Sequence, residues 1–167
     1  AHSLKFHPSF DPYLKAVIAH PLVSSGNATV VLFDTTHAHH RERWQRSIGK
    51  ESLDQHLLYI PLLEHDDFMA LLAAADVFLD TLPWGGGVTA YESLAAGLPV
   101  VFAPGETAVS NFALGWYRWA GLPPFAACNA SHYAALAALA AQAPRIHRRN
   151  DGHASHTSAA AEQGAAV

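Results

Sequence analysis

The residues with the clearest chemical potential form a glycine-rich corner, Gly85, Gly86 and Gly87, followed closely by Thr89 and Glu92. The glycines stand between a strand-like run and a helix-like run, where the backbone can approach a ligand and helix N–H groups point at an anion. The threonine adds a hydroxyl, and the glutamate adds a carboxylate that accepts hydrogen bonds from a ribose. Together they predict a site for a nucleotide diphosphate.

Structural explanations for the same residues stay open at this point. The corner lacks the G-x-G-x-x-G of dinucleotide folds and the GK[ST] of a P-loop, and three glycines also suit a tight turn. Thr89 and Glu92 have the spacing of a capping box, in which both side chains bind backbone N–H groups at a helix start. For Glu92 the residues alone favour capping over ribose binding, whereas Thr89 could serve both roles.

Composition sets the class of protein. The 167 residues suffice for one domain with a sizeable core. Half of them are hydrophobic, yet no apolar run approaches the roughly 20 residues that cross a bilayer. The net charge of −4 argues against a nucleic-acid surface. We therefore expect a soluble protein without nucleic-acid or membrane partners. The single cysteine, Cys128, cannot form an internal disulfide and is expected in the core.

Apolar runs of strand length alternate with helical patterns, which is typical of parallel βαβ units. The expected strands are 28–34, 57–62, 77–81, 100–103 and 125–127, and the expected helices are 8–20, 39–48, 66–75, 89–96, 108–120 and 131–142. The first strand is expected to be buried because of its β-branched content. This order predicts an α/β fold with an open, doubly wound, mostly parallel sheet, whose ligands bind beyond the carboxyl ends of the strands. Residues 1–143 are expected to form the domain, and 144–167 a disordered tail.

Several strings resemble the C-terminal catalytic half of the O-linked N-acetylglucosamine transferases and their SPINDLY-like relatives. They are LKFHPSFD at 4–11, LLEHDDFMALLAAADVFLD at 62–80 and DVFLDTLPWGGGVTAYESLAAGLPVVFAPG at 76–105. The likeness covers about residues 1–140, and its E-x-x-x-x-G-x-P-V-V portion is shared more widely among GT-B glycosyltransferases. The resemblance implies the Rossmann-like, donor-binding half of a GT-B enzyme. It also implies an N-terminal catalytic domain and tetratricopeptide repeats, which this sequence does not contain.

The resemblance assigns roles to individual positions. Lys5 matches the lysine placed against the donor diphosphate, and it is the candidate catalytic residue; from the residues alone a solvated surface lysine is favoured. Thr89 lies near the phosphates and Glu92 takes the acidic ribose position. The remaining substrate-binding candidates are Gly86, Gly87, Val88, His65, Phe68 and Glu106.

Some positions depart from the family pattern. Gly87 and Val88 stand where the animal enzymes have His-Thr, Phe68 replaces a histidine near the uracil, and Asn111 replaces a frequent arginine. These departures leave open whether the donor nucleotide carries uridine or guanosine. Phe68 could stack on a base or belong to the core. Glu106 could contact the sugar or simply charge a helix N-terminus.

The implied reaction moves N-acetylglucosamine from UDP-GlcNAc to Ser or Thr hydroxyls of a protein acceptor, by direct displacement and without a metal or other cofactor. The expected location is cytoplasmic or nuclear, and this chain by itself is expected not to turn over. Alternatives are a non-catalytic nucleotide-binding or interaction remnant, a relative that uses GDP-fucose, and a sugar-nucleotide epimerase.

Two further groups of residues have competing explanations. A metal site could involve His37, His39 and His40, or His65 with the adjacent 66–67 acids, but neither group has a known ligand spacing. The acids better suit a helix N-terminus. Helically spaced aromatic residues are expected to pack in the core; they are Phe112, Trp116, Tyr117 and Trp119. Trp84 either lines the donor pocket or covers the end of the sheet.

Overall fold

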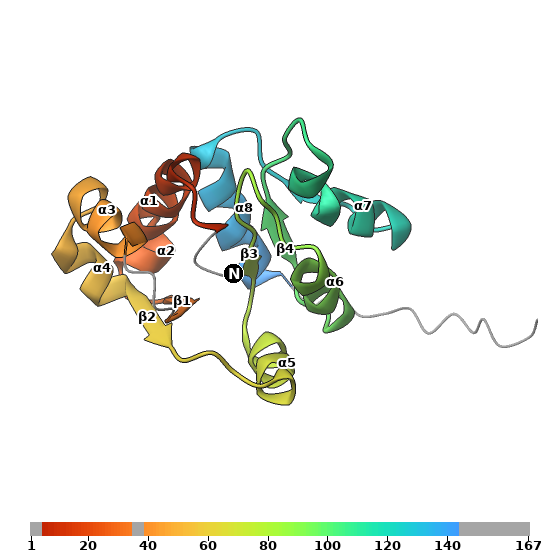
Figure 1. Cartoon of the computed structure of the whole chain (residues 1–167), viewed down its shortest axis with the longest axis horizontal. Helices are drawn as coiled ribbons and strands as arrows, with labels where there is room; N and C mark the ends of the chain where they lie inside the picture. The colour runs from red at the N-terminus through yellow and green to blue at the C-terminus, as the bar shows by residue number, and fades with distance from the viewer. Residues whose placement is uncertain (1–4, 35–38, 144–167) are drawn as a thin grey trace, which may run out of the picture.

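The computed structural model describes residues 5–34 and 39–143. Helices and strands alternate along these ranges, and every strand pair is parallel (Figure 1). The predicted α/β class is therefore confirmed. The proposed tail at 144–167 and His37 lie outside the described residues.

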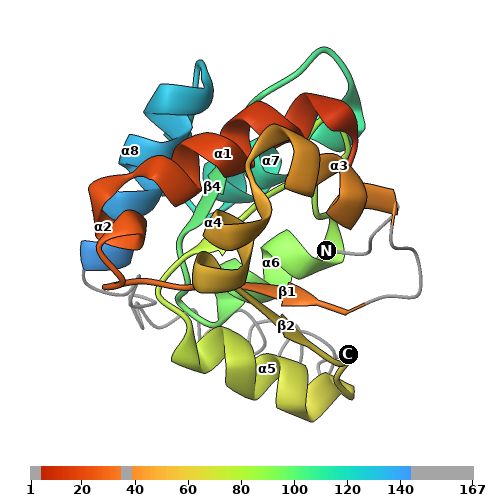
Figure 2. The same cartoon turned by 90° about the vertical axis from the view of Figure 1, so that its left-hand side faces the viewer.

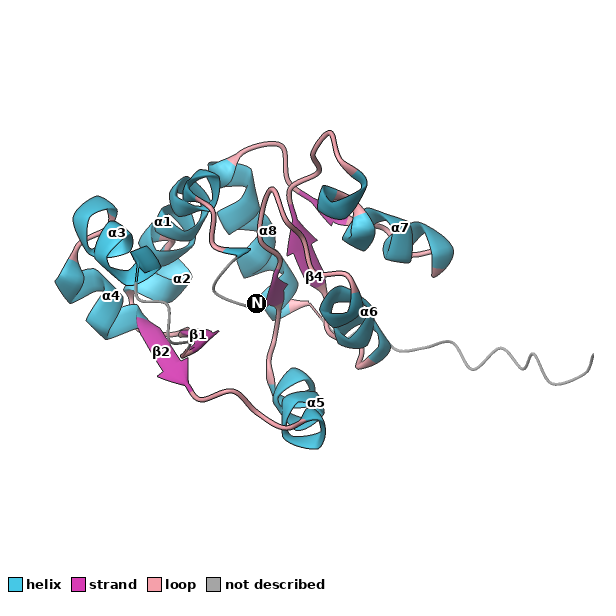
Figure 3. Cartoon of the chain, viewed as in Figure 1, coloured by secondary structure: helices cyan, strands magenta, loops and turns pink. Residues whose placement is uncertain are grey.

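The strands form two sheets rather than the one continuous sheet expected from the sequence (Figure 3). In the first sheet β1 (Val30–Phe33) pairs with β2 (Leu57–Ile60), and in the second the order is β3 (Phe78–Leu79), β4 (Val100–Phe102) and β5 (Phe125–Ala126). Within the described residues, no strand lies between β1 and β3, so no backbone hydrogen bonds connect the two sheets.

The helices follow the predicted pattern with four differences. Helix α2, a single turn that begins at Pro21 just after the expected helix 8–20, was not anticipated. Helix α4 was not anticipated, because seven residues show too little periodicity, and Gly49 with φ of 107° separates it from α3. The helix expected at 8–20 opens with a 3₁₀ turn. The helix expected at 108–120 divides into a 3₁₀ turn and α7. The elements are η2 (Pro8–Phe10), α1 (Asp11–Ala19), α2 (Pro21–Ser24), α3 (His39–Ser47), α4 (Lys50–His56), α5 (His65–Ala74), α6 (Val88–Ala95), η3 (Ala108–Ser110), α7 (Phe112–Trp119) and α8 (Ala130–Gln142).

One buried cluster joins the two sheets. It contains Val30 and Leu57 from the first sheet and Val101 from the second. Helices α1 and α8 pack along each other, and α8 also packs against β4 and β5 (Figures 1 and 2). Tyr133 of α8 is fully buried there, with its ring edge-on to Tyr13 of α1. The sheets are therefore held together by helix packing rather than by a strand ladder.

A second cluster packs α6 and α7 against β4. Tyr117 is fully buried, and its hydroxyl accepts a hydrogen bond from Val100 N at 2.8 Å and donates to Val100 O at 3.0 Å. The prediction of core packing is thus confirmed for Tyr117. It is wrong for Trp119, which is 74% exposed, and Phe112 is 40% exposed. Because α7 packs through one face only, aromatic residues on its other face stay at the surface.

Burial distinguishes the two sheets. All three residues of β4 are buried, whereas β1 exposes Val31 and β2 exposes Leu58. The expectation of a buried first strand therefore holds only in part: Val30 is buried, whereas on the opposite face Val31 is exposed and Phe33 is half-buried against Phe68 of α5. None of the described helices is long and apolar enough to span a membrane.

Candidate functional site

The glycine corner lies where β3 leads into α6. Helix α6 begins at Val88, its N-cap is Gly87, and no side chain caps it. Thr89 and Glu92 are therefore inside the helix, and the capping box considered for them does not form. The first N–H groups of a helix have no partner within it. Those of α6 are accordingly available to an anion.

Close packing explains two of the three glycines. A Cβ on Gly85 would lie 2.9 Å from both Asp80 Oδ2 and the Val109 carbonyl oxygen, and a Cβ on Gly86 would lie 2.5 Å from Thr89 Oγ1. Both distances are shorter than van der Waals contact, so a side chain would force the corner open. A Cβ on Gly87 would meet only the Phe112 ring, at an ordinary 3.6 Å.

A buried carboxylate organises the corner from beneath. Asp80, directly after β3, is 3% exposed, and its Oδ1 accepts hydrogen bonds from Thr81 N at 2.9 Å and Gly86 N at 2.6 Å. Burial raises the pKa of this carboxyl to about 6, although the two N–H donors and the Lys5 ammonium act in the opposite direction. Sequence reasoning assigned no role to Asp80. The available signal was its place in the L-D-T string before the glycines.

Lys5 reaches the same corner from the other end of the sequence. Its Nζ donates a hydrogen bond to the Gly85 carbonyl oxygen at 3.1 Å, across 80 residues of chain. This places a cation at the Gly85 carbonyl, three residues before the first residue of α6. The contact supports the position assigned to Lys5, while its role in binding stays a prediction.

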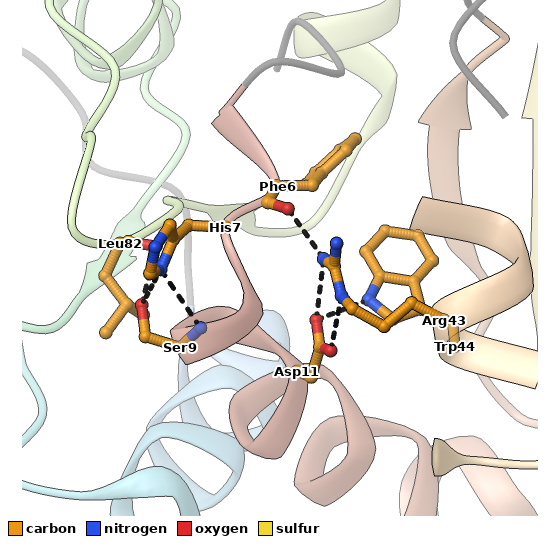
Figure 4. Close-up of polar contacts among 7 residues, drawn as sticks. All are labelled: Phe6, His7, Ser9, Asp11, Arg43, Trp44 and Leu82. Atoms are coloured by element: carbon orange, nitrogen blue, oxygen red, sulfur yellow. Dashed lines mark hydrogen bonds and ion pairs between the residues drawn. The ribbon is translucent and has the colours of Figure 1, made fainter. Parts of the chain in front are cut away.

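An ion pair holds the segment that carries Lys5 (Figure 4). Arg43 of α3 donates to both carboxylate oxygens of Asp11, at 2.6 and 3.0 Å, and to the Phe6 carbonyl oxygen at 2.6 Å. Trp44 Nε1 donates to the same carboxylate at 2.7 Å. Phe6 is buried against the Trp44 ring. The backbone next to Lys5 is thus fixed by residues that sequence reasoning did not single out.

Glu92 lies on α6 one turn beyond Val88, with 19% of its side chain exposed. His65, at the start of α5, places Nδ1 3.8 Å from Glu92 Oε1. The structure therefore brings these two sequence candidates together, His65 from the start of α5 and Glu92 from the middle of α6. The Thr89 carbonyl oxygen accepts a hydrogen bond from Ser93 Oγ at 2.7 Å, and Val88 is 70% exposed.

Phe68 is partly buried on α5, and its ring centre lies 6.0 Å from that of Phe33 at the end of β1. This contact gives Phe68 a packing role between α5 and the first sheet. Its other suggested role, stacking on a base, stays a prediction.

The loop after β4 lies against the glycine corner. Gly85 N donates to the Val109 carbonyl oxygen at 3.2 Å. Glu106 is exposed in this loop. On either side of it, the carbonyl oxygens of Gly105 and Thr107 accept hydrogen bonds from Asn111 Nδ2, at 2.6 and 2.7 Å. Asn111 therefore braces the loop that carries Glu106.

Two other candidates end at the surface. Trp84 is 57% exposed, and its carbonyl oxygen accepts from Thr81 Oγ1 at 2.7 Å. The expectation of a core Cys128 is wrong, because the residue is exposed beside α8 with its Sγ 3.2 Å from His132 Nδ1. In the described ranges, no three His, Cys, Asp or Glu side chains are grouped to hold a metal ion.

Comparison with known proteins gives matches over part of the chain. Proteins named probable UDP-N-acetylglucosamine–peptide N-acetylglucosaminyltransferase SPINDLY match about half of this chain. The protein from Eustoma exaltatum subsp. russellianum is 34% identical over 90 residues, 54% of this chain and 10% of its own length. The Arabidopsis thaliana protein is 34% identical over 89 residues, which are 53% of this chain and 10% of that protein. The chain is similar to the O-GlcNAc transferase and SPINDLY family.

The fold of this SPINDLY-like chain has a solved counterpart. A variant of the Thermobaculum terrenum O-GlcNAc transferase superposes with a TM-score of 0.67 at 23% identity, covering 83% of this chain and 26% of that one. No family model matches the chain. The chain spans about a tenth of the length of the SPINDLY proteins named above.

Proposed function

We propose that this chain binds the nucleotide-sugar donor of a glycosyltransferase, with the diphosphate held between Lys5 and the start of α6. The observation that carries the proposal is the Lys5 Nζ contact with the Gly85 carbonyl oxygen at 3.1 Å. It joins a cation to a helix start whose N–H groups have no capping side chain. Two sources of positive potential therefore converge at one place.

This arrangement suits a leaving diphosphate. When the bond between the sugar and the diphosphate breaks, the departing oxygen gains negative charge, and a positioned ammonium with helix N–H groups stabilises it. Lys5 thus contributes to the chemical step by supporting the leaving group.

Glu92 is the proposed ribose contact. Its two carboxylate oxygens can accept hydrogen bonds from two neighbouring hydroxyls, and the limited exposure of the side chain strengthens such contacts. His65 Nδ1 lies 3.8 Å from this carboxylate, on the neighbouring helix α5. Phe68 and Glu106 are proposed to approach the base and the sugar, respectively.

The sugar and acceptor are proposed from the relatives, whose printed names specify UDP-N-acetylglucosamine and a peptide. We extend both to this chain: N-acetylglucosamine as the transferred sugar and a Ser or Thr hydroxyl as the acceptor. We propose a reaction that uses no metal, with a cytoplasmic or nuclear location.

Calorimetric titration of UDP, GDP and UDP-N-acetylglucosamine against the 167-residue chain tests the donor site. Lys5→Ala and Glu92→Ala are each expected to weaken UDP binding by roughly 1 to 3 kcal/mol, because a charged hydrogen bond is lost. Lys15→Ala and Glu51→Ala are matched controls at exposed positions on α1 and α4.

The outcomes separate the alternatives. Tighter binding of GDP than of UDP would replace uridine by guanosine in the proposal. No binding of any of the three at millimolar concentration, by a chain whose circular dichroism shows a folded protein, would rule out the donor site. A non-catalytic interaction module would then be the better explanation.

A further inference from the structure

Asp80 is an unexpected residue to find beneath an anion site. Its carboxylate is enclosed by the loop 81–86, and Oδ2 lies where a Gly85 side chain would have to go. Tyr133 of α8 donates to the Asp80 carbonyl oxygen at 2.8 Å, and Asp80 N donates to Val101 O of β4 at 2.9 Å. Main chain and side chain of Asp80 are therefore both fixed.

The carboxylate uses a donor that the glycine corner would otherwise offer. Gly86 N–H points inward to Asp80 Oδ1 at 2.6 Å, so it is not directed at a ligand. The N–H groups left for an anion are those at the start of α6, beyond Gly87. The Asp80 hydrogen bond thus shapes the corner, while its negative charge opposes the anion that the corner is proposed to hold.

The charges around Asp80 are few. Lys5 approaches from the N-terminal segment, and its charge favours the ionised carboxylate. From α8 comes the Tyr133 hydroxyl, with Tyr13 of α1 beside it; β4 contributes a backbone carbonyl. An anion that attracts the Lys5 ammonium removes the Lys5 part of the compensation for Asp80, which is smaller than that of the Gly86 and Thr81 N–H groups, and it adds a like charge nearby. Both changes favour protonation of the carboxylate.

We propose, on the basis of the donor site described above, that Asp80 is a positioning residue: its carboxyl holds the glycine corner through Gly86 N–H, and it takes up a proton from solvent when the donor diphosphate binds beside Lys5. The hydrogen bond to Gly86 survives this step, because a neutral carboxyl keeps a carbonyl oxygen that accepts it. Binding and protonation are therefore linked, and the donor binds more tightly as the pH falls.

Two substitutions separate the hydrogen bond from the charge. Asp80→Asn keeps an oxygen acceptor at the same place without a charge, and Asp80→Ala removes both. UDP-N-acetylglucosamine is the probe, because its phosphates are both diesters, whereas a terminal phosphate gains a proton near pH 6 by itself. Calorimetry between pH 5.5 and 8, in buffers of different ionisation enthalpy, measures affinity and proton uptake together.

The unchanged chain is expected to bind several-fold more tightly at pH 5.5 than at pH 8, with net proton uptake near pH 7. Asp80→Asn is expected to bind at pH 8 at least as tightly as the unchanged chain, with a flat pH profile. Asp80→Ala is expected to bind at least tenfold more weakly at every pH. His65→Gln is the control for the imidazole beside Glu92, since imidazoles also titrate in this range, and it should retain the proton uptake.

The results distinguish failure of the inference from failure of the site. A pH profile in Asp80→Asn equal to that of the unchanged chain would overturn the role of Asp80 while leaving the donor site. Equal affinities for Asp80→Ala and Asp80→Asn at all pH values would overturn its positioning role. No binding by the unchanged chain would overturn the donor site itself. The pH dependence of the Gly86 amide chemical shift, expected in the unchanged chain and lost in Asp80→Asn, reports on the hydrogen bond without any ligand.

Discussion

The two sheets of this protein have the same parallel pairing but different surroundings. The β3-β4-β5 sheet carries a fully buried β4, with α6 and α7 packed against it and Tyr117 hydrogen-bonded to its backbone. The β1-β2 sheet leaves Val31 and Leu58 exposed on one face. The glycine corner follows β3 and therefore belongs to the β3-β4-β5 sheet. A site that must hold a charged ligand in one geometry is thus built on the better packed sheet.

The less enclosed side still contributes to the site. Helix α5, which follows β2, brings His65 to Glu92, and α3, which follows β1, holds the Lys5 segment through Arg43. The contribution of α5 is a single side-chain contact, whereas α3 also packs the buried Trp44 ring against Phe6. The difference predicts that damage to the β4 side costs stability, whereas damage to the β1-β2 face costs little.

The largest expected effect comes from one substitution made in each sheet. Val101→Ala in β4 removes two methyl groups from a fully buried position and is expected to lower the free energy of unfolding by about 3 kcal/mol. Val31→Ala in β1, where the side chain is 41% exposed, is expected to cost under about 1 kcal/mol. Urea denaturation measures both. Equal losses would show that the two sheets are equally enclosed in solution.

The second expected effect concerns the pH dependence of stability. The Asp80 pKa is raised to about 6 in the folded chain, so the folded state holds a proton that the unfolded state releases between pH 4 and 6. The contribution of Asp80 to stability is therefore present at low pH and is lost as the pH rises through 6, by about 2 kcal/mol between pH 4 and 7.

Comparison with Asp80→Asn isolates this contribution from those of other groups. The difference in unfolding free energy, variant minus unchanged chain, should grow in favour of the variant from pH 4 to pH 7. A difference that stays constant over this range would mean that Asp80 titrates normally in the folded chain.

The smallest expected effect sharpens the account of the corner. Gly85→Ala places a Cβ 2.9 Å from a backbone oxygen and from the Asp80 carboxylate, and it is expected to cost about 1 to 2 kcal/mol. Gly115→Ala on α7 is the matched control, because a Cβ there meets nothing within 4 Å and alanine favours a helix. Thermal unfolding compares the two. If Gly85→Ala were as stable as Gly115→Ala, the corner would be loosely packed.

Much of the local structure followed from residue patterns. The strands and most helices were predicted because apolar periodicity and glycine or proline punctuation are local properties. Gly97, with φ of 76°, ends α6 as expected. The failures were also local in origin. Helix α4 was too short to show a hydrophobic period. Trp119 and Cys128 are apolar residue types, but residue type alone does not show whether the rest of the protein covers a side chain, and both are exposed.

By itself the sequence determined the parallel α/β class, the glycine corner and the candidates around it, because chain order and residue type encode alternation and chemistry. Only the tertiary structure decided that Lys5 meets Gly85, that Asp80 takes the Gly86 N–H, and that Thr89 and Glu92 do not cap their helix. It also divided the strands into two sheets. These outcomes depend on contacts between residues far apart in the chain and on which groups are shielded from water, and neither is a property of a local sequence window.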